Sequence, residues 1–213
     1  MPVPFFARRI GHFARVAPLI VALVALAGCD RQSDGPEQAV RDNGGNASAT
    51  GDSATGHPPL SGTLDISKRG SDQPDVTFTG PDGKPVKLAD FRGKPLLVNL
   101  WATWCAPCVV ELPTLDALAQ REGDRLQVLV VSQDLEGAKI VDPFFAKRNF
   151  RALKPYTDTE NGLGFAYETG VMPTTVLYDA QGKEVWRMLG GMDWNASRAA
   201  TLMEDTLDSA KAS

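Results

Sequence analysis

The stretch "PLLVNLWATWCAPC", residues 95–108, joins an apolar run to two of the three cysteines in this 213-residue chain. An apolar run of this length is typical of a β-strand that is buried on both faces. After it, residues recur at helical spacing on one side of a predicted helix: Cys108, Leu112, Leu115 and Ala119. The sequence therefore predicts a buried strand that leads directly into a helix, with Cys105 and Cys108 at the junction.

Further elements follow the same logic along residues 64–213. The patterns predict a leading hairpin in residues 75–94, a buried strand at 126–132, a helix with the apolar stripe Ile140, Val141, Phe144 and Phe145, an antiparallel hairpin of 174–179 with 184–189, and a C-terminal helix over 199–210 with Asn195 as its N-cap. This order of elements predicts one α/β domain with a mixed central sheet that helices flank on both faces.

The spacing of Cys105 and Cys108 is compatible with three roles: half of a zinc site, a short structural disulfide or a redox-active pair. Structural zinc sites need about four Cys or His ligands. From residue 64 onward the chain contains these two thiols and no histidine. A disulfide across two intervening residues closes a very short loop, and its stabilisation through loop entropy is small. Ligand count and loop length therefore favour a redox-active pair.

The predicted junction gives Cys105 a distinct chemical environment. A residue at the start of a helix faces the unpaired backbone N–H groups of the first turn, at the positive end of the helix dipole. Both features favour a thiolate over a thiol. We therefore expect Cys105 to be a reactive thiolate at the carboxyl end of the buried strand.

The first 28 residues have the composition of an export signal. They contain Arg8, Arg9 and Arg15 and no acidic residue. An apolar run follows over residues 16–27, but as a helix it would rise only about 18 Å, well short of the roughly 30 Å hydrocarbon core of a bilayer. This segment is therefore predicted to be a signal peptide and not a membrane-spanning helix.

The signal ends in "LAGC", residues 26–29, which resembles the lipobox of bacterial lipoproteins. That resemblance implies that Cys29 is lipidated and that acyl chains hold the mature chain on a membrane surface. Asp30 resembles the residue that retains such lipoproteins in the inner membrane of many Gram-negative bacteria, so the expected location is its periplasmic face. The alternative is an ordinary signal peptide with a cysteine near the cleavage site.

A linker separates the signal from the α/β domain. Residues 29–63 are rich in small and polar residues and poor in large apolar ones, so we expect a disordered membrane tether. Its polar part, residues 30–61, is a flexible chain of about 32 residues with an r.m.s. reach of about 30 Å. Removal of the signal takes away three arginines and changes the formal net charge from −4 to −7, which argues against a nucleic-acid partner.

Two motifs carry a resemblance to a known family. "WATWCAPC", residues 101–108, resembles the active site of the thioredoxin superfamily. The segments "LLVNLWATWCAPCVVELPTLDAL", residues 96–118, and "TGVMPTTVLYDAQGKE", residues 169–184, are together similar to TlpA/ResA-type membrane-anchored thiol-disulfide oxidoreductases. The likeness implies a thioredoxin-like fold in which the N-terminal β-hairpin is an extension.

The same resemblance implies an activity and its partners. It implies disulfide exchange on exported cysteine-containing proteins, with electrons from a membrane thiol donor of the CcdA/DsbD kind. The expected protein is a monomer that needs no cofactor besides the redox-active disulfide Cys105–Cys108. Cys105 matches the nucleophile, which forms a mixed disulfide with the partner, and Cys108 matches the resolving thiol that releases it.

The resemblance also implies five substrate-binding residues near the cysteines: Trp104, Ala106, Pro107, Met172 and Pro173. Pro173 matches the cis-proline of the superfamily, and the alternative is an ordinary trans proline at a strand start. Met172 would offer its backbone to a substrate strand. We expect Trp101 in the core, and Trp104 either at the rim of the site or in half-exposed packing.

Glu111 is the candidate for proton transfer. Thioredoxin has a buried aspartate on the strand where this chain has Asn99, which cannot exchange a proton at neutral pH. Glu111 follows Cys108 by three residues, so it would lie one helical turn along the same side. ResA-like relatives carry a glutamate at the matching place. The alternative is a solvent-exposed glutamate on the helix surface.

Two classes of function remain open at this point. The first is a thiol-disulfide oxidoreductase that reduces exported proteins such as apocytochromes or copper-site cysteines. The second is a Cu(I)-binding metallochaperone that uses the same cysteine pair, with Met172 nearby. A copper carrier of the Sco kind would be expected to supply a histidine ligand, and the predicted domain has none. That ligand count favours the enzyme.

Overall fold

The computed structural model describes residues 60–209. The predicted signal peptide, the lipidation site Cys29 and nearly all of the predicted tether lie outside the described residues. The first described strand begins at Thr63, one residue before the predicted start of the domain.

The described chain begins with three short strands, then alternates between strands and helices, and ends with two strands and a helix. The strands are β1 (Thr63–Asp65), β2 (Thr77–Thr79), β3 (Pro85–Lys87), β4 (Leu96–Trp101), β5 (Gln127–Ser132), β6 (Pro155–Thr157), β7 (Thr174–Tyr178) and β8 (Glu184–Leu189). The helices are α1 (Ala106–Glu122), α2 (Ala138–Ala146), α3 (Gly162–Tyr167) and α4 (Ser197–Ser209), with a short 3-10 turn η1 (Leu88–Phe91).

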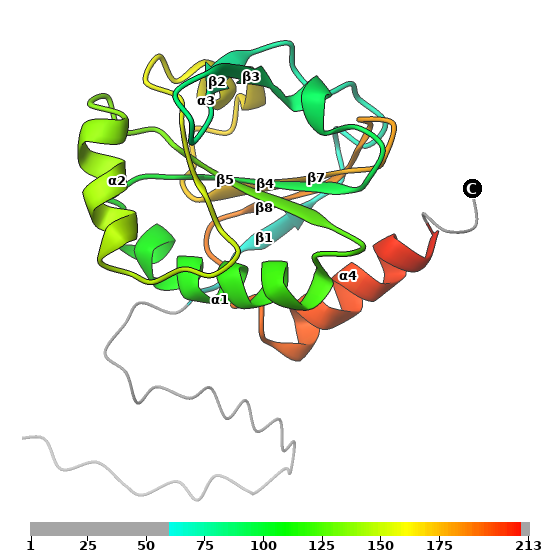
Figure 1. Cartoon of the computed structure of the whole chain (residues 1–213). Helices are drawn as coiled ribbons and strands as arrows, with labels where there is room; N and C mark the ends of the chain where they lie inside the picture. Colours follow the sequence, from blue (N-terminus) through cyan, green and yellow to red (C-terminus); the bar gives the residue numbers. More distant parts are fainter. Residues whose placement is uncertain (1–59, 210–213) are drawn as a thin grey trace, which may run out of the picture. The chain divides into compact units, whose positions relative to one another are not determined.

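One mixed sheet forms the centre of the domain, in the order β1-β8-β7-β4-β5-β6-β2-β3. Strands β4, β5 and β6 are parallel, and β7 is antiparallel to β4. All six residues of β4 are buried, as the apolar run predicts. Helices cover both faces of this sheet (Figure 1). The thioredoxin-like fold expected from the sequence is therefore confirmed.

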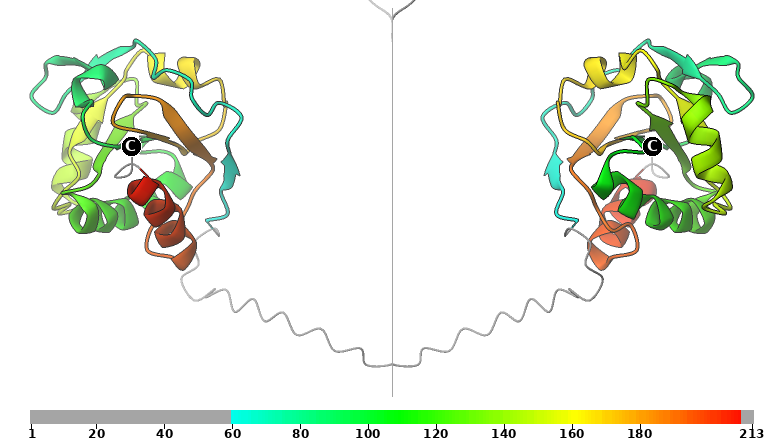
Figure 2. Two further views of the ribbon diagram at one scale, coloured as in Figure 1. Left: turned by 90° about the vertical axis from the view of Figure 1, so that its right-hand side faces the viewer. Right: turned by 90° about the vertical axis from the view of Figure 1, so that its left-hand side faces the viewer.

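The two faces of the sheet carry separate buried clusters. Successive residues of a strand point to opposite faces, so Leu97 and Trp101 of β4 pack with α1 and α4. Leu96 and Val98 pack on the other face, below α3 and the β2–β3 hairpin. Figure 2 shows the ribbon of the domain from two sides, with helices on either face of the sheet. By the same alternation, Asn99 faces the α1 layer.

The ends of the sheet differ from the sequence interpretation in several details. The predicted hairpin is present as β2 and β3, and β2 also pairs with β6, which makes the hairpin part of the sheet. Strands β1 and β6 and helix α3 were not predicted. The prediction of Asn195 as a helix N-cap is wrong, because α4 begins at Ser197 and the amide of Ala200 donates to the carbonyl of Ala196.

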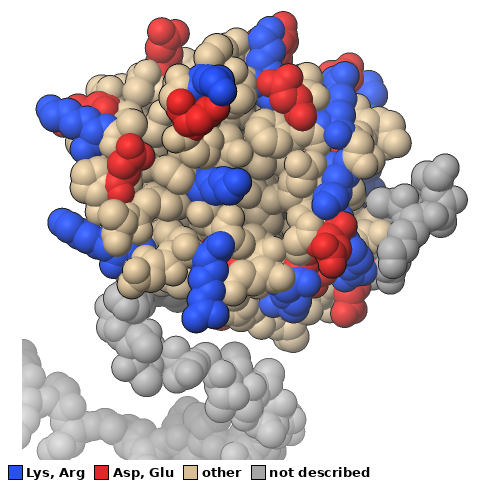
Figure 3. Space-filling view, viewed as in Figure 1, with Lys and Arg blue, Asp and Glu red and all other residues tan. Residues whose placement is uncertain are grey.

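Charged side chains are mixed on the described surface. Lys and Arg are interspersed with Asp and Glu over the face shown in Figure 3. Neither sign dominates this side of the domain, so the surface shown offers no single-sign patch that would favour a highly charged partner.

Candidate active site

The two cysteines lie where β4 passes into α1. Strand β4 ends at Trp101, and Cys105 is the N-cap residue of α1, which begins at Ala106. The Cys105 amide donates to the carbonyl of Ala102 at 3.1 Å, which closes a tight turn before the helix. Pro107 lies in the first turn of the helix, where a missing backbone N–H leaves no hydrogen bond unmade. The predicted strand-to-helix junction is confirmed.

Cys105 and Cys108 form a disulfide bond, with an S–S distance of 2.03 Å. Cys105 retains 6% of its surface exposed and Cys108 only 1%. An incoming thiol or disulfide therefore meets Cys105 before Cys108. This difference in access matches the roles of nucleophile and resolving thiol that the resemblance implies.

Asp134 fixes the turn that precedes the nucleophile. The Thr103 amide donates to Oδ2 of Asp134 at 2.9 Å, and the Thr103 hydroxyl donates to Oδ1 at 2.7 Å. The Ser132 hydroxyl donates to the same carboxylate at 2.7 Å. Asp134 is buried after the end of β5, so the parallel pairing of β4 and β5 brings this anchor beside the cysteine turn. Sequence reasoning did not identify it.

Pro173 lies beside the end of β4. The Met172–Pro173 peptide bond is cis, as the resemblance predicts. Thr174, the next residue, pairs with Leu100 across the antiparallel β7 and β4 strands. This register brings the Met172–Pro173 segment to the same end of the sheet as the cysteines. Two motifs that are far apart in sequence therefore form one site.

A groove of about 540 Å³ adjoins this end of the sheet. Trp104 and Met172, both predicted substrate-binding residues, line it, whereas Ala106, Pro107 and Pro173 are not among its lining residues. Trp104 is 71% exposed, so it forms a rim of the site and is not packed in the core. The groove also contains Phe165 of α3, a helix that the sequence interpretation missed, and Val171, which precedes Met172 in the second motif and was not singled out.

Glu111 lies inside the protein, with 0% of its surface exposed. The alternative of a solvent-exposed glutamate is therefore wrong. Trp194 Nε1 donates to Oε1 of Glu111 at 2.5 Å, whereas Oε2 has no hydrogen-bond partner of normal geometry among the described residues. Burial raises the pKa of this carboxyl group from 4.5 to about 8, and the hydrogen bond from Trp194 offsets only part of the shift.

Asn99 lies on the strand below this carboxyl group and carries no charge. Its Nδ2 donates to the Thr175 hydroxyl of β7 at 2.9 Å, and its side chain is buried. Asn99 and the Met192 backbone lower the pKa of Glu111, so both favour the carboxylate. Glu111 is thus the titratable group that the structure places next to the resolving cysteine along α1.

Two further properties concern residues 60–209. Within this range no three His, Cys, Asp or Glu side chains come together in a group that could hold a metal ion. None of the helices there has the length and apolar character needed to cross a bilayer.

Comparisons with known proteins agree with this geometry. The family described as Redoxin matches residues 68–203, more than half of the chain. Thiol-disulfide oxidoreductase ResA of Bacillus subtilis is 32% identical over 123 residues, which are 58% of this chain and 68% of the relative.

Solved structures share the fold. A protein described as a putative thiol:disulfide interchange protein DsbE from Chlorobium tepidum aligns with a TM-score of 0.58 and 24% identity, over 65% of this chain and 97% of that one. An exposed lipoprotein thioredoxin of Streptococcus pneumoniae aligns with a TM-score of 0.52 and 29% identity, over 64% and 99%. With the paired cysteines at the start of α1, these likenesses show that the chain belongs to the redoxin family and is a thiol-disulfide oxidoreductase of the TlpA/ResA type.

Proposed function

We propose that this protein is a lipid-anchored reductant of exported proteins, held by Cys29 on the periplasmic face of the inner membrane. One observation carries the catalytic part of the proposal: a buried cysteine pair at the N-terminus of α1 is followed, one turn later, by a buried carboxyl group whose pKa lies near 8. The lipobox supports the anchor, and the pneumococcal structural relative is itself described as a lipoprotein.

The proposed reaction begins with the reduced pair. The thiolate of Cys105 attacks one sulfur of a partner disulfide, the partner S–S bond breaks, and the other partner sulfur leaves as a thiolate that takes up a proton. Cys108 then attacks the Cys105 sulfur of the mixed disulfide and releases the partner as a dithiol. The oxidised Cys105–Cys108 disulfide is restored to the dithiol by two electrons from a membrane thiol donor of the CcdA/DsbD kind.

Glu111 assists the second step in this proposal. The thiol of Cys108 must lose a proton before it attacks, and a base is most effective when its pKa lies near the working pH. Burial brings the pKa of Glu111 to about 8, so part of the population is carboxylate at neutral pH and can accept that proton. Asn99 cannot do so, because a side-chain amide does not titrate in this range.

The groove supplies the proposed substrate contacts. Trp104, directly before the nucleophile, offers an exposed apolar surface. Met172, in the second motif of the site, also lines the groove. A substrate segment that crosses the cysteines could pair with the backbone at Met172 and place apolar side chains against Trp104. Cysteine motifs of apocytochromes or of copper sites are the substrates we expect.

Cysteine variants of the full chain test this mechanism. We expect Cys105→Ser to abolish reduction of insulin, because no thiolate remains to attack. Cys108→Ser should accumulate a mixed disulfide with the physiological partner, identified by mass spectrometry after acid trapping. Normal turnover by Cys105→Ser would remove the mechanism. Tight one-to-one binding of Cu(I) without insulin reduction by the wild type would instead favour the metallochaperone.

A further inference from the structure

Trp194 makes a direct contact with the proposed proton-transfer group from a distant part of the chain. It lies in the segment between β8 and α4, it is fully buried, and its Nε1–H donates to Oε1 of Glu111. We propose that Trp194 is a positioning residue that holds the Glu111 carboxyl group in one orientation and leaves Oε2 as the oxygen that exchanges a proton with Cys108. This inference rests on the function proposed for Glu111.

A second contact ties Trp194 to the same turn of α1. The Trp194 amide donates to the Thr114 hydroxyl at 3.2 Å, and that hydroxyl donates to the backbone carbonyl of Glu111 at 2.8 Å. Trp194 therefore holds the side chain of Glu111 directly and its backbone through Thr114. The donor to Oε1 is thus itself attached to the backbone of the same helical turn, which limits the rotation of the carboxyl group.

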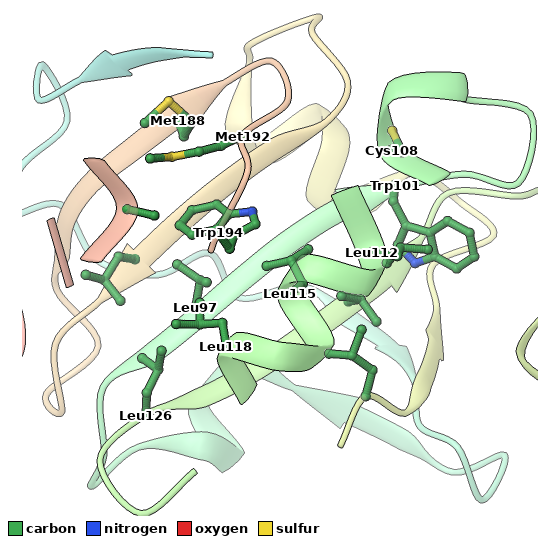
Figure 4. Packing of buried hydrophobic residues seen from close by; sticks show 14 of the residues in the cluster. Leu97, Trp101, Cys108, Leu112, Leu115, Leu118, Leu126, Met188, Met192 and Trp194 are labelled. Atoms are coloured by element: carbon green, nitrogen blue, oxygen red, sulfur yellow. The ribbon is translucent and has the colours of Figure 1, made fainter. Parts of the chain in front are cut away.

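The indole ring is itself held from the other side. Trp186 of β8 stacks on Trp194, with ring centroids 6.4 Å apart and an interplanar angle of 14°. The Nε1–H of Trp186 donates to the Thr206 hydroxyl of α4 at 3.1 Å. Trp194 also belongs to the buried cluster that contains Leu97 and Leu115 (Figure 4). Packing against β8 thus supports the indole ring, whereas the hydrogen bond to Oε1 of Glu111 comes from Trp194 itself.

These contacts have a chemical consequence for the two carboxyl oxygens. Oε1 accepts the indole N–H, and Oε2 has no partner of normal geometry among the described residues. A donor on Oε1 stabilises the carboxylate, so Trp194 opposes the effect of burial on the pKa of Glu111. Within residues 60–209 no charged side chain contributes to that pKa: the groups that act on it from the neighbouring strand and loop are Asn99, Trp194 and the Met192 backbone.

The test compares two tryptophan variants of the full chain. Trp194→Phe keeps an aromatic ring but removes the N–H that contacts Glu111. Trp186→Phe is the matched control, because it removes a buried indole N–H from the same stack without touching the carboxyl group. A third form carries 3-benzothienylalanine at position 194, which keeps the bicyclic shape and lacks the N–H. This form replaces Trp194→Phe in the comparison if the cavity left by phenylalanine prevents folding.

Two measurements are made on each folded form. The first follows the Glu111 carboxyl pKa by carbon-13 NMR of labelled glutamate, with Glu111→Gln to assign the signal. The second is the pH profile of mixed-disulfide resolution in a single turnover. Loss of one hydrogen bond to a charged group should raise the carboxyl midpoint by about 1 pH unit in the position-194 forms. The kinetic midpoint should rise with it, and Trp186→Phe should leave both near wild type.

The outcomes separate this inference from the function proposed for Glu111. If the carboxyl midpoint moves and the kinetic profile does not, Trp194 positions the group but Glu111 does not serve the reaction. If neither midpoint moves in a folded position-194 form, or if Trp186→Phe moves both equally, the positioning role of Trp194 is overturned.

Discussion

A buried carboxyl group without a cationic partner is a source of pH-dependent stability. Glu111 is fully buried, and its pKa in the folded protein, about 8, lies above the unfolded value of 4.5. Below pH 4.5 the group is neutral in both states. Between these two values the folded protein holds a proton that the unfolded chain has lost, so folding becomes less favourable as the pH rises. The stability that depends on this proton is gone above about pH 8.

We therefore predict that Glu111→Gln changes the pH dependence of the unfolding free energy. Glutamine is neutral at every pH, so the variant should gain stability relative to wild type between pH 5 and pH 9, by a few kcal/mol at most. Urea unfolding of the two oxidised proteins at pH 5, 7 and 9 measures this difference. A constant difference across the range would show that the carboxyl group does not titrate as its burial indicates.

For this single residue, the sequence could predict Glu111 as the candidate proton-transfer group but not the burial of its side chain. The three-residue spacing after Cys108 identified Glu111, but spacing alone left a surface position equally open. In the structure the Glu111 side chain is buried and accepts a hydrogen bond from Trp194, which lies 83 residues further along the chain. A contact between such distant residues depends on how β8 and α4 pack on α1, and no local pattern in "CVVELP" reports it.

At the scale of helices and strands, two buried aspartates each fix a neighbouring loop by accepting hydrogen bonds from it. Asp134 accepts the amide and hydroxyl of Thr103 in the turn before Cys105. Asp116 of α1 accepts the amides of Ala152 and Leu153 at 2.8 and 3.0 Å, in the segment before β6. Both carboxylates are buried. Only the first of them fixes the element that presents the nucleophile.

This pair gives a matched prediction. Asp134→Ala and Asp116→Ala should each lower the unfolding free energy by about 1–3 kcal/mol, because each leaves partly or fully buried donors without their acceptor. We expect only Asp134→Ala to slow insulin reduction severalfold among the folded population, since it frees the turn that carries Cys105. Urea unfolding and initial rates, both at 25 °C, measure the two effects. Equal rates in the two variants would mean that Asp134 has no more than a structural role.

Strands with long apolar runs and the β2–β3 hairpin could be predicted, whereas the other short elements could not. Strands β4, β5, β7 and β8 each have five or six residues with a clear apolar pattern. Strands β1 and β6 have three residues each, too few for any periodicity. Helix α3 consists of the glycine-containing segment GLGFAY, and its first amides donate to the Asp158 carboxylate. Its formation depends on that contact more than on helix propensity.

For the molecule as a whole, the sheet leaves little room for a partner at its edges. The outermost strands, β1 and β3, have three residues each. Short edge strands offer few unpaired backbone groups to another chain. A substrate strand is therefore better accommodated at the Met172 segment, next to the cysteines, than at either edge of the sheet.

The proposed anchor can be tested separately from the chemistry. We predict that wild-type protein sediments with membranes and incorporates labelled palmitate, whereas Cys29→Ala does neither and is released with the periplasmic fraction. Insulin reduction should be equal in the two proteins, because Cys29 precedes the domain and is not one of the paired cysteines. Membrane association of Cys29→Ala at the wild-type level would assign the attachment to another feature.

The unequal burial of the four tryptophans makes the active site observable by fluorescence. Trp101, Trp186 and Trp194 are at most 3% exposed, whereas Trp104 is 71% exposed and lies next to the nucleophile. An aqueous quencher such as iodide should therefore reach the emission of Trp104 and leave that of the other three nearly unchanged. A bound substrate segment would shield Trp104 and suppress quenching, so the unmodified protein reports occupancy of its own groove. Trp104→Phe, which lacks the accessible indole, should show almost no iodide quenching with or without substrate.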